Sequence, residues 1–498
     1  MGWLHNWSGI ILGWLLFVIF VTGSCGYYRH EITLMMTPEL RPLAQVDVPP
    51  ETAADRAVQW LVTHAGGAGE WTTLLPDEKS PALRVSWFGD EPGDAVLDPR
   101  TGNPLSPEPR ATGGGDFLYR LHSDLHFVSP MAGRIVVSLI GVALLMLLVT
   151  GLVTHRNIIR DLFRFRRGRG WRTRLDLHNM TGVLGLPYHL LIVVSGLVTV
   201  MMLLMPWGVA SVYGASGLGQ FAQEAFPSAV EEPSGTVSPL RVAPLVKAAQ
   251  RRWHGDEVGE IHIDNPGTAG MTVTINHPIR GILPMRKPSV TFDPSDGRVL
   301  GTTNEDLSNV SLLHSQLFGL HVAHFAGPVV RLLMFCFGLV GAAMVATGLL
   351  LWTAKRWPSP TAEAGKIKPR RAVIIVDRLN AAVLAGLPIA IGGYFWANRL
   401  IPAGAANRAI AEQQAMFWVW AAAIVLAFIS PARMMWPLLL AIAGSGLAAA
   451  GFASLLAGGT GSPVEPVLLV TGLALLAVGF SGRFGKMPGA AGAEVTAN

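Results

Sequence analysis

Long apolar runs separated by polar segments of unequal length dominate the chain. About 20 mainly apolar residues are needed for a helix to cross a hydrocarbon layer ~30 Å thick. The candidate spans are 8–29, 132–154, 179–205, 328–353, 373–396, 413–430, 432–457 and 464–481. The pattern predicts a membrane bundle of seven or eight helices. The first run follows no basic segment and no clear cleavage site, so we expect it to be retained as a span.

The two long polar segments, about 31–125 and 207–325, share one pattern: a helical stretch, then alternating strands, then an Asp-Pro turn. The predicted helices are 49–65 and 238–253, the strands 82–88 and 271–277, and the turns 96–105 and 290–301. The sequence therefore predicts two small α+β domains outside the bundle.

The first 356 residues contain an internal repeat. Residues 4–23 resemble 177–196, which matches His5 to His178, and residues 121–156 resemble 313–356, which matches His122 to His314. Two copies of helix, external domain and helix predict a four-helix core. The predicted boundaries are spans at 1–30, 121–155, 177–206 and 313–355, external domains at 31–120 and 207–312, basic loops at 156–176 and 356–372, four further spans within 373–482, and a tail at 483–498.

Composition and charge agree with this picture. Of 498 residues, 50% are hydrophobic and 14% charged, which excludes a large soluble enzyme. Eight arginines lie in 156–174 and more basic residues follow the fourth span, so both loops are expected to be cytoplasmic. The two long segments then lie on the external side, and both termini are cytoplasmic if there are eight spans. The basic pI of 9.4 comes from these loops and does not indicate nucleic-acid binding.

Neither cysteine chemistry nor the last four spans offers an active site. Cys25 and Cys336 each lie within a span, so no disulfide framework or cysteine metal site is expected. Residues 373–481 contain no histidine, and their tryptophans lie near the predicted interfaces. We interpret this region as a scaffold or a unit that docks a partner.

Histidines carry the candidate chemistry. Ten of the fourteen lie at or inside the ends of the first four spans: His5, His30, His122, His126, His155, His178, His189, His314, His321 and His324. Bis-imidazole haem needs two histidines at one depth on different helices. His5 with His178 could form a cytoplasmic tier, and His122 with His314 an external one. His189 shares a helix face with His178, roughly 16 Å further along the axis, and could replace a member of either pair.

Other roles compete for these residues. His30, His155, His321 and His324 could cap helices or lie among lipid headgroups. His122 and His126, four residues apart on a predicted helix, would also suit a zinc or copper site. His189 could donate to a hydroxyl in the bundle, and the glycines could serve helix packing rather than a porphyrin.

The motifs LHNWSGIILGWLLFVIFVTG, DLHNMTGVLGLPYHLLIVVSGL and LHSQLFGLHVAHFAGPVVRLL, with the DPxxG turns, resemble the PepSY-associated transmembrane proteins, which include ferric-siderophore reductases of the bacterial inner membrane. The resemblance covers about 1–360, and 377–402 is similar to longer members with extra spans. It implies a haem b core, two periplasmic PepSY domains and electron transfer to chelated ferric iron. The family's histidines fall on His5, His122, His178, His189 and His314. The extra His126, His321 and His324 depart from the pattern and leave the external pair open.

The sequence thus favours an inner-membrane oxidoreductase with two haems b, fed by a quinol or a separate redox protein, since no nucleotide fingerprint is present. Its expected partners are a ferric chelate or siderophore and membrane lipid, with no nucleic acid. The alternative is a membrane-anchored PepSY module that binds a peptide, protease or envelope partner without redox activity. A permease is a third possibility, but few polar residues line the last four spans.

Overall fold

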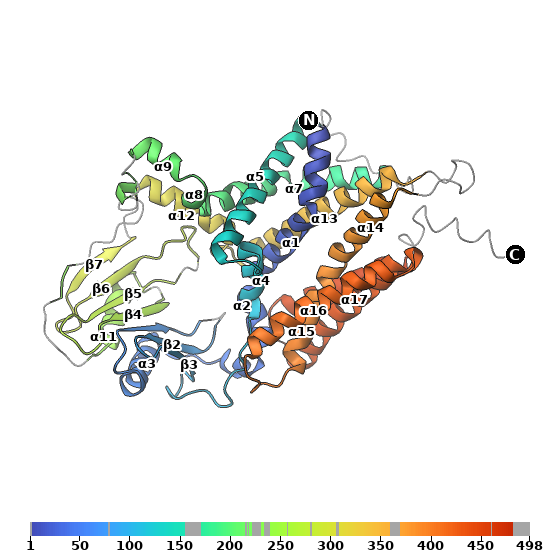
Figure 1. Cartoon of the computed structure of the whole chain (residues 1–498). Helices are drawn as coiled ribbons and strands as arrows, with labels where there is room; N and C mark the ends of the chain where they lie inside the picture. Colours follow the sequence, from blue (N-terminus) through green and yellow to red (C-terminus); the bar gives the residue numbers. More distant parts are fainter. Residues whose placement is uncertain are drawn as a thin grey trace. The chain divides into compact units, whose positions relative to one another are not determined.

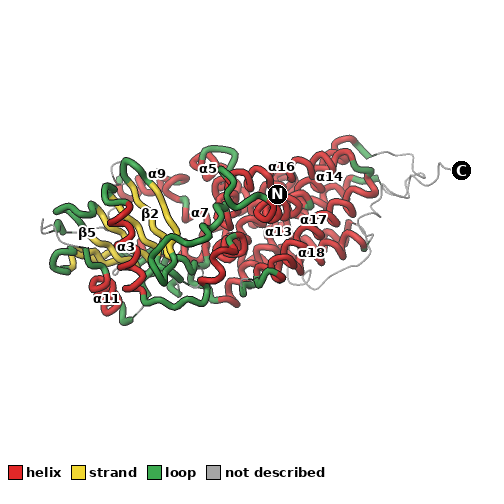
Figure 2. Tube along the Cα trace, turned by 90° about the horizontal axis from the view of Figure 1, so that it is seen from below, coloured by secondary structure: helices red, strands yellow, loops and turns green. Residues whose placement is uncertain are grey.

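The structure is a computed structural model. It describes residues 2–77, 80–154, 171–214, 217, 219–221, 231–233, 240–255, 257–278, 281–304, 308–358, 369–459 and 461–481. The chain forms two compact units. The first contains Met1–Met36, Ala111–Leu197 and Pro328–Asn498, and the second contains Thr37–Arg110 and Val198–Gly327. Figures 1 and 2 show the helices and strands of both units.

The first unit is helical. Its helices are α1 (Gly2–Gly26), α2 (Arg29–Met36), α4 (Gly114–Asp124), α5 (Pro130–Thr154), α7 (Trp171–Thr199), α13 (Pro328–Arg356), α14 (Arg371–Leu384), α15 (Gly386–Leu400), α16 (Arg408–Ile429), α17 (Ala432–Leu456) and α18 (Val464–Phe480). Among the described residues, seven helical segments are long and apolar enough to cross a membrane, and α14 and α15 together form one of them. The eighth predicted span is the shorter helix α18, of 17 residues. The protein is therefore a multi-pass membrane protein, as the sequence predicts.

Helices α1 and α13 pack closely because glycines remove side chains from their interface. A Cβ on Gly341 would lie 2.4 Å from the Phe20 ring, and one on Gly338 would lie 2.2 Å from the Ser24 hydroxyl. Small residues that let backbones approach are the usual basis of helix association in lipid. This contact sets the spacing on which the core of the bundle depends.

Helices α5 and α13 match the predicted apolar runs 132–154 and 328–353, and a break in the helix separates each from a shorter helix before it. The sequence predicted one helix through His122 and His126, but α4 ends at Asp124, and Leu125 and His126 adopt the left-handed conformation. His122 and His126 therefore do not share a helix face. In the second copy of the repeat, α12 (Asn309–Val322) ends at Val322, Ala323 adopts the left-handed conformation, and α13 begins at Pro328.

The C-terminal helices are fixed to the core by buried polar groups. Arg408 and Glu412 on α16 form an ion pair in which neither side chain is exposed. Arg408 also donates to the carbonyls of Ala111 and Asn398, and Glu412 accepts from the Thr112 hydroxyl at 2.6 Å. At the other end of the spans, the Trp14 indole donates to Asn380 on α14. Helices α14–α18 are therefore an integral part of this unit.

The second unit is built on one antiparallel sheet of seven strands, in the order β3-β2-β1-β4-β5-β6-β7. The strands are β1 (Glu70–Leu74), β2 (Leu83–Phe88), β3 (Gly93–Leu97), β4 (Glu260–Asp264), β5 (Thr272–Asn276), β6 (Ser289–Phe292) and β7 (Val299–Thr303). Its helices are η1 (Pro38–Leu43), α3 (Pro50–His64), α8 (Met201–Leu204), α9 (Pro206–Tyr213), α11 (Ala243–Arg252) and α12 (Asn309–Val322).

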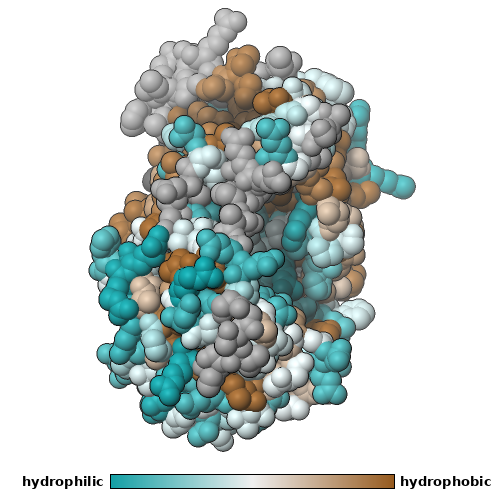
Figure 3. Space-filling view, turned by 90° about the vertical axis from the view of Figure 1, so that its left-hand side faces the viewer, coloured by the Kyte–Doolittle hydropathy of each residue, from teal (hydrophilic) through white to brown (hydrophobic). Residues whose placement is uncertain are grey.

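The strands of the two external segments meet in this sheet. We expected two small domains, whereas β1 of the first segment pairs with β4 of the second. This pairing removes one open strand edge from each half. Alternate residues of β1, β4 and β5 are buried beneath α3 and α11, and the others form a polar outer face. The view in Figure 3 shows extensive hydrophilic surface beside apolar patches, as expected for a chain with polar and membrane-spanning parts.

A carboxylate that is hydrogen-bonded to an arginine stabilises the turn after β3, and this stabilisation depends on pH. Hydrogen bonds from the Arg100 side chain lower the pKa of Asp98. The pKa of an aspartic acid in the unfolded chain is about 4. Because the folded pKa of Asp98 is lower, the ionised carboxylate stabilises the fold at pH values above the unfolded pKa. This stabilisation is lost as the pH falls through the folded pKa. We expect Asp98→Asn to speed hydrogen exchange in 96–105 at pH 7 by a small factor, since Arg100 is exposed. At pH values below the folded pKa, the two proteins should exchange alike.

Candidate functional site

A cavity of about 700 Å³ lies among α1, α5, α7 and α13. Its size falls in the range of about 300–1,000 Å³ that is typical of small-molecule and cofactor pockets. Aliphatic side chains and several glycines form most of its wall: Gly9, Gly13, Leu147, Leu148, Gly151, Gly182, Leu186, Val345 and Gly348. These are the four helices of the predicted core.

His5 of α1 and His178 of α7 meet at this cavity. Their ring centroids are 6.2 Å apart and their planes are inclined by 70°. Metal–imidazole bonds are about 2 Å long, so two imidazoles on opposite sides of one metal ion have ring centres roughly 6 Å apart. The pairing of the repeat-related histidines thus has the separation that one shared iron requires.

Polar groups of the neighbouring helices contact these two rings. Nδ1 of His178 lies 2.8 Å from the Met344 carbonyl of α13, and Nδ1 of His5 lies 3.5 Å from the Thr150 hydroxyl of α5. A hydrogen bond to one ring nitrogen orients the other toward a metal and fixes the tautomer. A Cβ on Gly348 would lie 3.1 Å from the His178 ring, so this glycine provides the space that His178 occupies.

The cavity also has polar and cationic lining that the sequence analysis did not assign. Lys355 and Arg356, at the end of α13, line it together with Asn6 and Asn179. The two asparagines directly follow His5 and His178, so the repeated Leu-His-Asn triplet was the available signal. The lining fits haem b in three respects. The two imidazoles can act as iron ligands, the apolar wall with its glycines can accommodate the flat ring, and the cationic pair can bind the carboxylates.

His189 is completely buried and does not line the cavity. Its ring packs against Phe20 and Tyr188, and a Cβ on Gly341 would lie 3.0 Å from Nε2. Neither ring nitrogen forms a hydrogen bond with the described residues, although the Phe337 carbonyl lies near the ring. A buried imidazole whose two nitrogens lack hydrogen bonds destabilises a membrane bundle. Such a residue within a membrane span is usually functional.

The other predicted histidines of the first unit have separate surroundings. Nδ1 of His122, on α4, lies 2.9 Å from the Ile19 carbonyl. His126 is exposed and stacks on Phe417. His30, on α2, accepts a hydrogen bond from Arg29. His155 lies outside the described residues.

His314, His321 and His324 belong to the second unit. His314 and His321 lie on α12, and His324 follows it. Burial, with a contribution from Arg286, lowers the pKa of His314 and favours the neutral ring. The pairing of His122 with His314 stays a prediction, because the two residues belong to different units.

The comparisons with known proteins agree with the fold. The description "PepSY-associated TM region" matches residues 2–355. The uncharacterized protein PA4219 of Pseudomonas aeruginosa is 30% identical over 382 residues, which cover 68% of this chain and 86% of that protein. The family match over residues 2–355 spans the four helices that line the cavity and the strands between them. The chain therefore belongs to the family of PepSY-associated transmembrane proteins.

Proposed function

We propose that this protein is a haem b oxidoreductase of the bacterial inner membrane that passes electrons to chelated ferric iron. One observation carries the proposal: His5 and His178, from different helices, meet at a cofactor-sized cavity inside the bundle. The ferric-siderophore substrate rests on the family resemblance and remains part of the proposal.

The residues around the cavity have distinct tasks in this function. A haem bound there supplies a one-electron carrier. His5 and His178 would hold it through their ring nitrogens, and the Met344 carbonyl orients His178. Lys355 and Arg356 are placed to pair with the propionates, since both line the cavity at the end of α13. The aliphatic wall excludes water and so favours a carrier that exchanges electrons without protons.

The direction of transfer follows from the charge of the loops. The basic segments after α5 and α13 favour a cytoplasmic location, which makes the sheet unit periplasmic. The ferric chelate would then be reduced on the periplasmic side, and a quinol or redox protein would supply electrons. A second haem rests on the sequence alone, in which His189 lies on the same face of α7 as His178, further along the helix.

The test is a dithionite-reduced minus oxidised spectrum with haem quantitation on the purified protein. We expect the bands of low-spin, bis-histidine haem b and at least one haem per chain. Adding a ferric chelate to the reduced protein should reoxidise the haem and yield ferrous iron. A folded protein that stays free of haem after expression with an ample haem supply would leave the membrane-anchored binding module as the function.

A further inference from the structure

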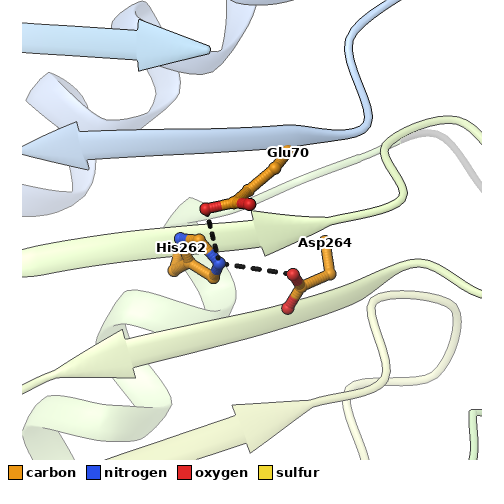
Figure 4. Close-up of side chains that lie close together, drawn as sticks. All are labelled: Glu70, His262 and Asp264. Atoms are coloured by element: carbon orange, nitrogen blue, oxygen red, sulfur yellow. Dashed lines mark ion pairs between the residues drawn. The ribbon is translucent and has the colours of Figure 1, made fainter. Parts of the chain in front are cut away.

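Three potential metal ligands gather on the polar outer face of the sheet, away from the helices that cover its other side. Glu70 belongs to β1, and His262 and Asp264 belong to β4 (Figure 4). Because residues two apart on a strand point to the same face, the alternation of β4 puts His262 and Asp264 side by side. The pairing of β1 with β4 brings Glu70 to the same place.

The distances among the three side chains suit a single metal ion. Nε2 of His262 lies 3.3 Å from a carboxylate oxygen of Glu70 and 3.3 Å from one of Asp264. All three ligand atoms lie within 4.8 Å of one another. Zinc bonds of about 2.0–2.1 Å at tetrahedral angles place neighbouring ligand atoms about 3.3 Å apart.

Neighbouring hydroxyls orient these ligands. The Thr72 hydroxyl lies 3.0 Å from Nδ1 of His262, which leaves Nε2 directed at the carboxylates, as Figure 4 shows. The Thr272 hydroxyl donates to the second oxygen of Asp264 at 3.3 Å. Metal-binding histidines and carboxylates commonly have such supporting bonds on their far side.

The strand register also places two acidic residues against each other. Glu70 is the direct cross-strand partner of Asp264, and like charges in that position destabilise a sheet. Lys287, which contacts β4, is paired with Glu260 at 2.7 Å instead. A divalent cation between Glu70 and Asp264 would turn this repulsion into attraction.

We propose that Glu70, His262 and Asp264 bind a divalent transition-metal ion of the zinc class, with solvent completing the coordination. One nitrogen and two oxygen ligands suit Zn²⁺, which accepts both kinds. The side chains are partly exposed, at 43% for Glu70, 28% for His262 and 45% for Asp264, so an ion can enter from solvent. This site is independent of the proposed haem and of iron reduction.

The bound ion would join the two external segments. Glu70 comes from the first segment and the other two ligands come from the second, and β1–β4 is the pairing that connects the two halves of the described sheet. Occupancy should therefore slow hydrogen exchange in β1 and β4 more than in the outer strands β3 and β7.

The test is calorimetric titration of Zn²⁺ into the full-length protein in detergent, together with the variants Glu70→Gln, His262→Ala and Asp264→Asn. We expect each variant to lose one zinc equivalent or to bind it at least tenfold more weakly. Glu260→Gln is the matched control, because it removes a carboxylate from the same strand and face outside the cluster. It should bind zinc as the wild type does.

Hydrogen exchange with and without Zn²⁺ gives a second readout on the same samples. Protection of β1 and β4 that requires His262 supports the proposal. Equal zinc binding by the wild type and His262→Ala would overturn the proposal, and so would hydrogen exchange that zinc does not change. Either result would mean that His262 only contacts the two carboxylates. Haem content, measured in parallel, should be the same in all these variants, so the outcome is separate from that of the haem proposal.

Discussion

Replacing His178 by alanine is expected to remove the haem bound in the cavity, with a loss of one haem equivalent per chain. Without His178 the iron would keep a single protein ligand, His5, on one face. The truncation also breaks the contact of the ring with the Met344 carbonyl. His5→Ala should have the same effect, because the His5 ring lines the same cavity with its centroid 6.2 Å from that of His178. Haem quantitation and the reduced minus oxidised spectrum of each purified variant measure the loss.

Two controls make this result specific. His254→Ala removes an exposed imidazole from the second unit and should leave the haem content unchanged. Added imidazole should restore the low-spin spectrum of a His178→Gly variant, because the free ligand can fill the space of the missing side chain. Full haem content in both His5→Ala and His178→Ala would refute the assignment of this cavity.

Replacing Arg408 by leucine is expected to cost about 3–5 kcal/mol of unfolding free energy, the typical penalty when one member of a buried ion pair is removed. Glu412 would lose its cationic partner in a site with no exposure, with Thr112 and Asn398 as its remaining partners. The midpoint of thermal unfolding in detergent, followed by circular dichroism, measures the effect. Arg433→Leu, at an exposed position on α17, is the control and should change little.

The double variant Arg408→Leu/Glu412→Leu distinguishes the ion pair from simple packing. Removing both charges leaves no unpaired ion, so it should unfold at a higher temperature than Arg408→Leu. If the single variant is as stable as the wild type, then α14–α18 are not fixed to the core through this pair. Retained haem in a destabilised Arg408→Leu protein would show that the pair serves the fold rather than the cavity.

Local patterns predicted much of this fold. The apolar runs gave the spans, and the Asp-Pro turns with alternating residues gave strands near β2 and β5. The breaks after α4 and α12 escaped prediction, since each depends on residues in the left-handed conformation, Leu125, His126 and Ala323, that are not glycine. The pairing of β1 with β4 was also missed, because strand partners distant in the sequence leave no periodic signal.

The same distinction applies to the candidate sites. The internal repeat linked His5 to His178, and the structure brings these two together. Helix periodicity placed His189 on the face of His178, but it could not foresee that Phe20 and Gly341 close around the ring. His262 was not among the candidate residues, because its partner Glu70 lies in the other external segment and no spacing in the sequence links the two.

The central strand pair has a consequence for how the chain acquires its structure. Residues paired between β1 and β4 are about 190 positions apart, and α5 and α7 lie between them in sequence. During synthesis, β1 must therefore wait with one edge open until two further helices have been inserted and β4 has emerged. Such non-local pairing is slow and leaves the waiting strand exposed to aggregation. A chaperone that shields open strand edges should therefore raise the yield of this protein.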